Sequence, residues 1–355
     1  MITVNKTDFL NAIKATKTSC GKIDLQPILK TIHIKSENGG LTLTCTDCTN
    51  VTRAVIESNN TEPIDVCLNA DKLEAIVNRL DEQITIEIKD ANALIKSGKL
   101  KYKLMYINSD EFPELEFDLK EETKIVLDSD EFINAINKTF YASAVEGINT
   151  LSGICFTFNE TGYEVASTDG NRLSVVEYEN PYINITGQYI LPKKTLVDVA
   201  KYTSGEVNMF LTDSRIVITT ANYLFATTVI NGTYPKYKEL IPKNPNIATI
   251  NKKDILTALE NVAIMSDDRT NIVTLDFKKD ELELMTQSAD IGEAKDTIDV
   301  DFNDELKIAF NYRFLVEVLK SIDTETITFE MNTALSPCII KSNFLHLIMP
   351  VQQRG

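Results

Sequence analysis

Apolar and polar residues recur in the same order in three distant segments of the chain. An acidic residue, two apolar residues, a polar residue, alanine and another apolar residue follow one another in residues 8–13 (DFLNAI), 131–136 (EFINAI) and 254–259 (DILTAL). The separation is the same from residue 8 to 131 as from 131 to 254. Apolar residues at i, i+3 and i+4 predict one face of an amphipathic helix. The chain is therefore interpreted as a threefold repeat.

A second helix is predicted later in each repeat, with an apolar residue at its opening and a leucine five positions on. These pairs are Leu68 and Leu73, Leu191 and Leu196, and Phe310 and Leu315. The six predicted helices span residues 6–17, 70–80, 129–141, 192–201, 251–263 and 311–320. Thr7 and Ser129, which precede an acidic residue, are the predicted N-caps of two of them.

The stretches between the helices alternate between apolar and polar residues, which is typical of half-buried strands. The clearest are residues 41–45, 84–88, 215–219 and 326–330. Each repeat therefore combines strands and two helices, which favours an α+β fold of antiparallel sheets with the helices on one face. Boundaries near 122–123 and 246–247 divide the chain into domains 1–122, 123–246 and 247–355.

The charge of the chain is unevenly distributed. The 355 residues include 36 Lys and Arg against 52 Asp and Glu, a net charge of −16, yet the predicted helices carry a small positive excess. This argues against a protein that coats nucleic acid with its whole surface, but one basic face remains compatible with a polyanion. The alternative is that these cations are ordinary solvated residues of helices. Arginines are few, so a DNA contact would be made to phosphates and be independent of sequence.

Enzymatic motifs are absent. Cys45 and Cys48 form a single C-x-x-C without a second pair, and His33 and His346 lie in alternating strand patterns, so neither a metal site nor a His-based catalytic site is predicted. No phosphate-binding P-loop and no nucleophile elbow occur. We therefore expect no catalytic residue, metal or cofactor. The alternative is a carboxylate-dependent enzyme on a repeated α+β scaffold, for which residues 267–268 (DD) are an example of paired carboxylates.

No membrane-spanning run and no signal-like N-terminal layout is found, so we expect a cytoplasmic protein with reduced cysteines.

Several segments resemble one family. Residues 167–174 (STDGNRLS) resemble the ATDGHRLA segment of bacterial DNA sliding clamps, the beta subunit of the replicative DNA polymerase III holoenzyme. Residues 232–245 resemble the family's GRFPDY…LPKNP stretch, and residues 345–351 resemble its terminal apolar strand. Residues 110–113 and 26–29 are similar to two further markers, so the resemblance covers nearly the whole chain.

The resemblance implies a fold and a function. Three repeated DNA-clamp domains form half of a closed ring, and two chains join head to tail as a homodimer. The helices line the hole, through which double-stranded DNA passes. Such a processivity factor tethers the polymerase, because a threaded ring needs only weak phosphate contacts that permit sliding. A clamp-like interaction module that no longer encircles DNA is a further alternative.

The resemblance also implies a groove between the second and third domains that binds short peptides of the replicative polymerase, the clamp loader and repair proteins. The matching positions are Leu151, Thr168, Asn171, Arg172, Leu173, Pro235, Leu240, Leu347 and Met349. By pattern alone, Leu151, Leu173, Leu347 and Met349 are better explained as core residues, and the resemblance reverses that interpretation. Asn171 replaces the family's usual His, and Glu239 stands where some members carry Arg, so the peptide preference is expected to differ.

Two further surfaces follow from the resemblance. The ring seam would be formed by Tyr102 and Leu104 of the first domain and by Ile264 and Met265 of the third, although the same pattern fits an ordinary surface strand and core. The positions predicted to face DNA are Lys14, Lys17, Lys22, Lys72, Arg79, Lys138, Lys193, Lys194, Lys201, Arg313 and Lys320.

Overall fold

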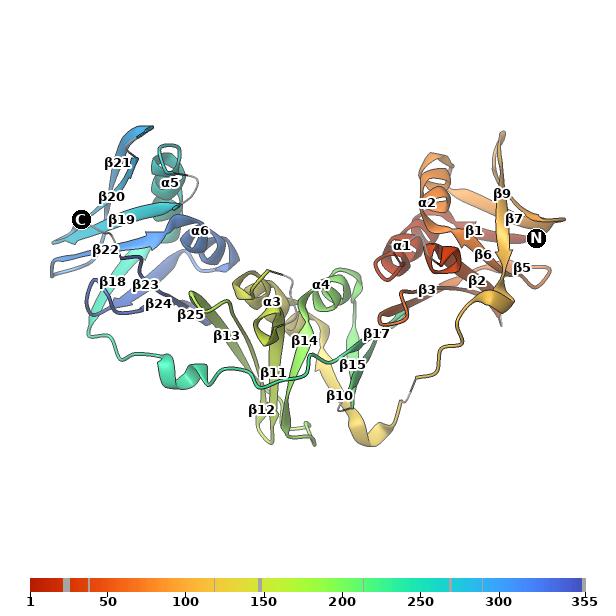
Figure 1. The fold of residues 1–355 in the computed structure, drawn as a ribbon, viewed down its shortest axis with the longest axis horizontal. Coiled ribbons are helices and arrows are strands. Elements are labelled where there is room, and N and C mark those ends of the chain that lie inside the picture. The colour runs from red at the N-terminus through yellow and green to blue at the C-terminus, as the bar shows by residue number, and fades with distance from the viewer. Residues whose placement is uncertain are drawn as a thin grey trace. The chain divides into compact units, whose positions relative to one another are not determined.

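The computed structural model describes residues 1–21, 26–37, 39–117, 119–145, 149–212, 214–267, 270–288 and 290–352. The chain divides into two compact units, one formed by residues 1–133 and 194–229, the other by residues 134–193 and 230–355 (Figure 1). The predicted lysine Lys22, and Asp268 of the predicted carboxylate pair, lie outside the described residues.

The predicted helices are present within two residues of their expected bounds. They are α1 (Lys6–Lys17), α2 (Ala70–Arg79), α3 (Ser129–Thr139), α4 (Lys193–Tyr202), α5 (Lys252–Ala263) and α6 (Tyr312–Ser321). The residues expected to open the second helices were placed wrongly, because Leu68, Leu191 and Phe310 lie in the preceding strands. The leucines five positions on are buried in the helices as expected.

The predicted N-caps were also wrong. Asn5 caps α1, because its side chain accepts hydrogen bonds from the N–H groups of Thr7 and Asp8, and Asp128 does the same for the first turn of α3. Asn69, Asn251 and Asn311 cap α2, α5 and α6. A short polar side chain at the end of a strand thus satisfies the free amides of the helix that follows directly.

The first unit is built on a 13-stranded sheet in the order β10-β15-β16-β17-β4-β3-β2-β6-β9-β8-β7-β1-β5. Its strands are β1 (Ile2–Asn5), β2 (Thr31–Glu37), β3 (Gly40–Thr46), β4 (Val51–Glu57), β5 (Asn59–Asn60), β6 (Asp65–Asn69), β7 (Gln83–Lys89), β8 (Asn92–Ser97), β9 (Leu100–Asn108), β10 (Lys124–Asp128), β15 (Glu206–Leu211), β16 (Arg215–Thr219) and β17 (Tyr223–Thr228). Antiparallel pairing of β17 with β4 joins the N-terminal third of the chain to part of the middle third.

The second unit contains two sheets, in the orders β14-β11-β12-β13-β25-β24-β23-β18 and β21-β20-β19-β22. The first comprises β11 (Gly153–Asn159), β12 (Gly162–Thr168), β13 (Arg172–Glu179), β14 (Gly187–Pro192), β18 (Asn246–Asn251), β23 (Thr326–Met331), β24 (Cys338–Lys341) and β25 (Leu345–Ile348). The second comprises β19 (Ile272–Lys278), β20 (Glu281–Ser288), β21 (Gly292–Asp299) and β22 (Leu306–Asn311). All strand pairs described are antiparallel, as expected for the α+β fold.

The repeated apolar stripes form the contacts between helices and sheets. Phe9, Ala12 and Ile13 of α1 are fully buried, and the equivalent residues of α3 and α5 are at most 1% exposed. Burying a large apolar side chain contributes about 1.5–3 kcal/mol. In the first unit, α1 also packs beside α2 (Figure 1). The 3.6-residue period was therefore a reliable sign of which helix faces are buried.

Candidate functional site

A tight turn between β12 and β13 carries three of the residues predicted for the groove. Thr168 ends β12, and Arg172 begins β13. The Asp169 carboxylate accepts hydrogen bonds from the backbone N–H groups of Asn171 at 2.9 Å and of Arg172 at 3.2 Å. Gly170 has a φ of +89°, which glycine adopts without a steric penalty. The sequence TDGN therefore specifies this turn locally.

Arg172 is the most connected side chain of this region. Its Nε lies 3.1 Å from an Asp169 carboxylate oxygen, and its other nitrogens reach the Glu317 carboxylate and the Tyr141 carbonyl. The guanidinium lies 4.2 Å from the centre of the Phe314 ring. Glu317 and Phe314 belong to α6, so one buried cation joins the middle third of the chain to its C-terminal third.

Strand pairing brings the end of the chain to the same place. Strand β13 pairs with β25, which sets Leu173 opposite Leu347. The N–H of Met349 donates to the Asn171 carbonyl at 2.8 Å. Leu173 and Leu347 are buried in one apolar cluster, against which the half-buried Leu151 packs, whereas Met349 is 40% exposed. The structure thus assembles these residues around one apolar floor with an exposed methionine at its rim.

The two remaining groove residues are not buried in this floor. Pro235 and Leu240 are exposed, and Leu240 ends the short 3-10 helix η6 (Tyr237–Leu240). The cluster instead contains Tyr234 and Tyr237 from the same segment. These two tyrosines were not among the predicted residues, although their three-residue spacing in GTYPKYKEL was the available signal.

A hollow of about 550 Å³ lies beside the cluster and is lined by Val175, Tyr237, Ile241 and Leu345 among others. The nine predicted residues do not line it, but Val175 and Tyr237 belong to the same cluster as Leu173. A second hollow, of about 480 Å³, is lined by Leu335, Ala309 and Val351, which follows Met349 by two residues. Apolar hollows with a few polar groups are typical of binding sites.

A buried carboxylate supports the rim of the first hollow. Glu164 is 4% exposed, accepts a hydrogen bond from the Tyr237 hydroxyl, and pairs with Lys238 Nζ at 2.7 Å. The neighbouring Glu177 hydrogen-bonds to Glu164, and this contact together with burial raises the pKa of Glu177. Glu164 therefore attaches η6, and with it Leu240, to strand β12.

His346 lies in the core behind the groove. It is fully buried on β25, and its Nδ1 is 3.2 Å from the Tyr141 hydroxyl, which also accepts a hydrogen bond from Ser321. Burial, and secondarily the charge of Arg172, lower the pKa of His346 to about 3. The imidazole is therefore neutral near pH 7 and serves as a polar core residue.

The predicted basic residues of the first unit differ in their availability. Lys14, Lys72, Arg79 and Lys201 are exposed. Lys17 bridges to Asp71 and Glu74 of α2, each at 2.6 Å, and these contacts raise its pKa. Lys194 donates to the Thr18 carbonyl at 2.6 Å and lies 3.6 Å from Asp198.

The predicted basic residues of the second unit also differ in their exposure. Arg313 and Lys320 of α6 are exposed, although Arg313 donates to Asn271 and Lys320 pairs with Glu260. Lys193 is half-buried, with its Nζ 5.9 Å from the Phe140 ring centre. Lys138 is only 3% exposed, near Asp323 and over the Phe344 ring, so this prediction fails for a residue that the fold places inside rather than on a DNA-facing surface.

The predicted seam residues lie in different units, one pair on a strand and the other directly after a helix. Tyr102 and Leu104 are half-buried on β9, whose residues 100–105 pair with β8 on one side only within the described chain. Ile264, directly after α5, is 77% exposed, and Met265 is half-buried. The edge of the nearby four-stranded sheet is β21.

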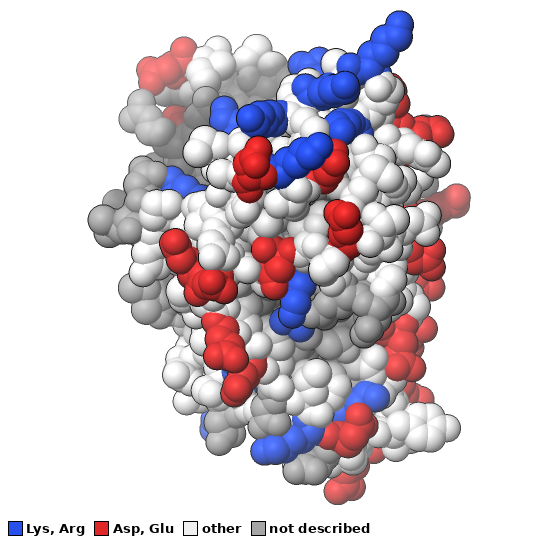
Figure 2. Space-filling model, turned by 90° about the vertical axis from the view of Figure 1, so that its right-hand side faces the viewer, with Lys and Arg blue, Asp and Glu red and all other residues white. Residues whose placement is uncertain are grey.

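The charges of these two edges are opposite. Lys101 and Lys103 are exposed on β9, whereas β21 exposes Glu293 and Asp299 together with Lys295, which leaves a net negative charge. Figure 2, which faces the β5–β7–β9 side of the first unit, shows Lys and Arg gathered towards its upper end, with acidic and further basic residues scattered over the remainder. Unpaired edges of opposite charge are suited to pairing with one another.

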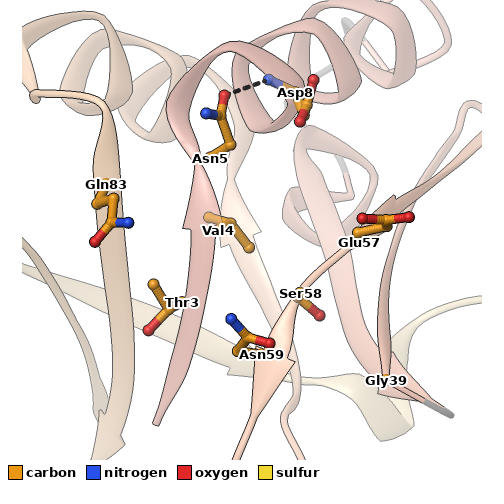
Figure 3. A pocket seen from close by; sticks show the side chains of 9 residues that line it. All are labelled: Thr3, Val4, Asn5, Asp8, Gly39, Glu57, Ser58, Asn59 and Gln83. Atoms are coloured by element: carbon orange, nitrogen blue, oxygen red, sulfur yellow. Dashed lines mark hydrogen bonds between the residues drawn. The ribbon is translucent and has the colours of Figure 1, made fainter.

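One further hollow lies in the first unit. A polar hollow of about 530 Å³ at the start of α1 is lined by Asn5, Asp8 and Glu57 among others, and Asp8 also supplies an N–H to the Asn5 cap (Figure 3). Within the described ranges, no group of three His, Cys, Asp or Glu side chains is placed to hold a metal ion. None of the helices in the described chain has the length and apolar character required to cross a membrane.

Comparison with known proteins identifies the fold and the family. Family models described as the N-terminal, central and C-terminal domains of the DNA polymerase III beta subunit match residues 1–116, 126–236 and 238–352. The beta sliding clamp of Synechococcus elongatus is 29% identical over 309 residues and that of Chlamydia muridarum 25% over 362, covering 82% and 98% of both chains respectively.

Solved structures of sliding clamps have the same fold as this chain. A sliding clamp from Pseudomonas aeruginosa bound to griselimycin has a TM-score of 0.92 at 22% identity, and one from Bacillus subtilis has 0.89 at 22%, each covering 99% of both chains. At this identity they establish the fold of three repeated clamp domains. Because the three family models together cover almost the entire chain, it belongs to the family of DNA polymerase III beta subunits, the beta sliding clamps that act as processivity factors.

Proposed function

We propose that this chain forms a closed ring with a second copy of itself, encircles double-stranded DNA without sequence preference, and tethers the replicative polymerase in the cytoplasm. The observation that carries the proposal is the threefold repeat of two helices per domain, with exposed cations on α1, α2, α4 and α6 of an otherwise acidic chain. Weak phosphate contacts are sufficient for a threaded ring, because enclosure rather than affinity retains it.

The decisive experiment compares circular with linearised DNA. Clamps loaded on a nicked circle should remain bound in high salt and be lost after a single cut, whereas binding through surface charge is lost in high salt on both. The double variant Lys14→Glu with Lys72→Glu should reduce loading several-fold, and Lys279→Glu, an exposed lysine on the β19–β20 turn, is the matched control. Equal retention on both DNA forms would contradict enclosure and support a module that does not encircle DNA.

The proposed closure is a head-to-tail homodimer in which β9 of one copy meets β21 of the other. The unpaired edges and their opposite charges support this pairing, and contacts by Tyr102, Leu104, Ile264 and Met265 would flank it. The expected mass in solution is twice 39.8 kDa. A chain that remains monomeric at micromolar concentration would contradict the proposal. Reversing charge on Lys101 and Lys103 should shift the equilibrium towards monomer, because like charges then face each other.

The apolar cluster around Leu173 and Leu347 is the proposed docking groove for short peptides from the polymerase, the clamp loader and repair proteins. Its support is an apolar floor, an exposed Met349 and adjacent hollows, which suit a peptide with a few apolar anchors. The exposed Glu239, at the end of η6, favours peptides without an acidic residue at the facing position.

The groove is tested by the double variant Leu173→Ala with Met349→Ala, measured by fluorescence polarisation of a labelled polymerase peptide. The expected loss is about 2 kcal/mol or more, because a few buried anchors dominate such interfaces. Val55→Ala, an exposed aliphatic residue on β4 in the other unit, is the control and should leave affinity unchanged. Unaltered affinity in the double variant would mean that the peptide binds elsewhere.

A further inference from the structure

Two cysteines from different elements meet at the end of α1. Cys20 lies in the turn that follows the helix, and Cys45 lies on β3. Their Sγ atoms are 2.8 Å apart, and both lie near the Thr31 carbonyl oxygen, at 3.8 and 3.5 Å. A disulfide requires a sulfur–sulfur bond of about 2.05 Å. Only a small further approach therefore separates this pair from a covalent bond.

The backbone holds both cysteines in place. The N–H of Cys20 donates to the Lys17 carbonyl at 3.1 Å, and the neighbouring Ser19 hydroxyl lies 2.7 Å from that of Thr52 on β4. Cys45 is fully buried on β3 and pairs with Thr52 of the neighbouring strand β4. The close contact therefore joins two anchored segments, which keeps the sulfur atoms at high effective concentration.

The two thiols differ in access. Cys20 is half-buried, whereas Cys45 is enclosed between α1 and the sheet, and desolvation raises its pKa well above the ordinary value. The thiolate is the nucleophilic form of cysteine and accessibility controls its oxidation. Cys20 is therefore the cysteine that reacts first with an oxidant, and Cys45 is its partner, which remains a protonated thiol until the second step.

We propose that Cys20 and Cys45 are a reversible modification site, at which a peroxide-class oxidant forms an intramolecular disulfide. The Cys20 thiolate attacks one peroxide oxygen, the O–O bond breaks, and sulfenic acid forms with release of hydroxide, which takes up a proton. The Cys45 sulfur then attacks the Cys20 sulfur, losing its proton as the S–O bond breaks and water leaves. In total, two thiols and one hydrogen peroxide give one disulfide and two waters.

The bond would attach the turn after α1 to the central sheet of the first unit. In that turn, the Thr18 carbonyl already accepts a hydrogen bond from Lys194 of α4. Because a cross-link restricts the unfolded chain, the oxidised protein should melt at a higher temperature than the reduced one. The C-x-x-C partner of Cys45 in the sequence, Cys48, is exposed on the following turn, so geometry selects Cys20 in its place.

The test uses the full-length protein treated with hydrogen peroxide under non-denaturing conditions, followed by alkylation and peptide mapping without reductant. Wild type and Cys48→Ser should each yield a peptide pair linked through Cys20 and Cys45, lighter by two hydrogen atoms, which dithiothreitol separates. Cys20→Ser should abolish the link while leaving the melting temperature of the reduced protein nearly unchanged. Cys45→Ala is the second variant, and it should abolish the same link.

The alternatives are distinguished in the same experiment. A link between Cys45 and Cys48, an intermolecular link through Cys48, or overoxidation of Cys20 would each overturn the proposal when found in place of the link between Cys20 and Cys45. If Cys45→Ala fails to fold, Cys20→Ser and Cys48→Ser alone still decide it, because only the former should prevent the link. None of these outcomes depends on DNA or peptide binding, so this inference stands or falls separately from the proposed function.

Discussion

Replacing Arg172 with alanine should be among the most destabilising single changes in this chain. The guanidinium side chain is 8% exposed and pairs with Asp169, itself 15% exposed, at 3.1 Å. Removing it takes away the Nε donor of one Asp169 carboxylate oxygen and the side-chain donor of the Tyr141 carbonyl, while the backbone N–H groups of the turn still donate to Asp169. It also ends the stacking on Phe314. Breaking a buried ion pair by removing one partner costs about 3–5 kcal/mol. A desolvated cation–π contact contributes about 2 kcal/mol. We expect a loss within the first range.

The partner on α6 provides the comparison. Glu317 is 47% exposed, so water can solvate its carboxylate when the arginine is absent. Glu317→Gln should therefore lower the free energy of unfolding by less than about 1 kcal/mol, as for other exposed pairs. Arg172→Lys should lie between the two, because lysine keeps the charge but loses the planar contacts.

The assay is urea unfolding of each full-length variant, followed by circular dichroism and evaluated as the shift of the midpoint at constant slope. A loss of less than 1 kcal/mol for Arg172→Ala would refute the reasoning, and so would an equal loss for Glu317→Gln. Peptide affinity should fall in parallel for Arg172→Ala, because its backbone neighbour Asn171 holds Met349.

Two other predictions concern titratable groups of the second unit. Because burial lowers the pKa of His346 to about 3 in the folded protein, against 6.5 ordinarily, the unfolded chain binds a proton between these values that the folded chain does not. The free energy of unfolding should therefore fall as the pH drops from about 6.5 towards 3, and His346→Gln should make this fall shallower; an identical pH slope in both proteins would contradict it. Glu164→Gln should weaken peptide affinity several-fold, because η6 loses its ion pair through Lys238, and unchanged affinity by fluorescence polarisation would show that η6 does not need this anchor.

Much of the local structure could be read from the sequence. The 3.6-residue spacing of Phe9, Ala12 and Ile13, and its repetition in α3 and α5, predicted both the helices and their buried faces. The turn at 168–172 is equally local, because Asp169 and Gly170 specify it through their own backbone contacts. Such features depend on residues within a few positions of each other, and a linear pattern records them directly.

The identity of distant partners required the tertiary structure. Arg172 and Glu317 are 145 positions apart, and a sequence shows the charge of each but not their contact. Lys138 has the same charge as Lys14 and lies on a similar helix, yet Lys138 is buried with its Nζ over the Phe344 ring and Lys14 is exposed. The pattern marked Cys45 with Cys48, whereas folding brings it to Cys20. Local periodicity is determined by the backbone, whereas long-range pairing and burial are determined by how sheets and helices stack. The threefold pattern alone did not specify that stacking.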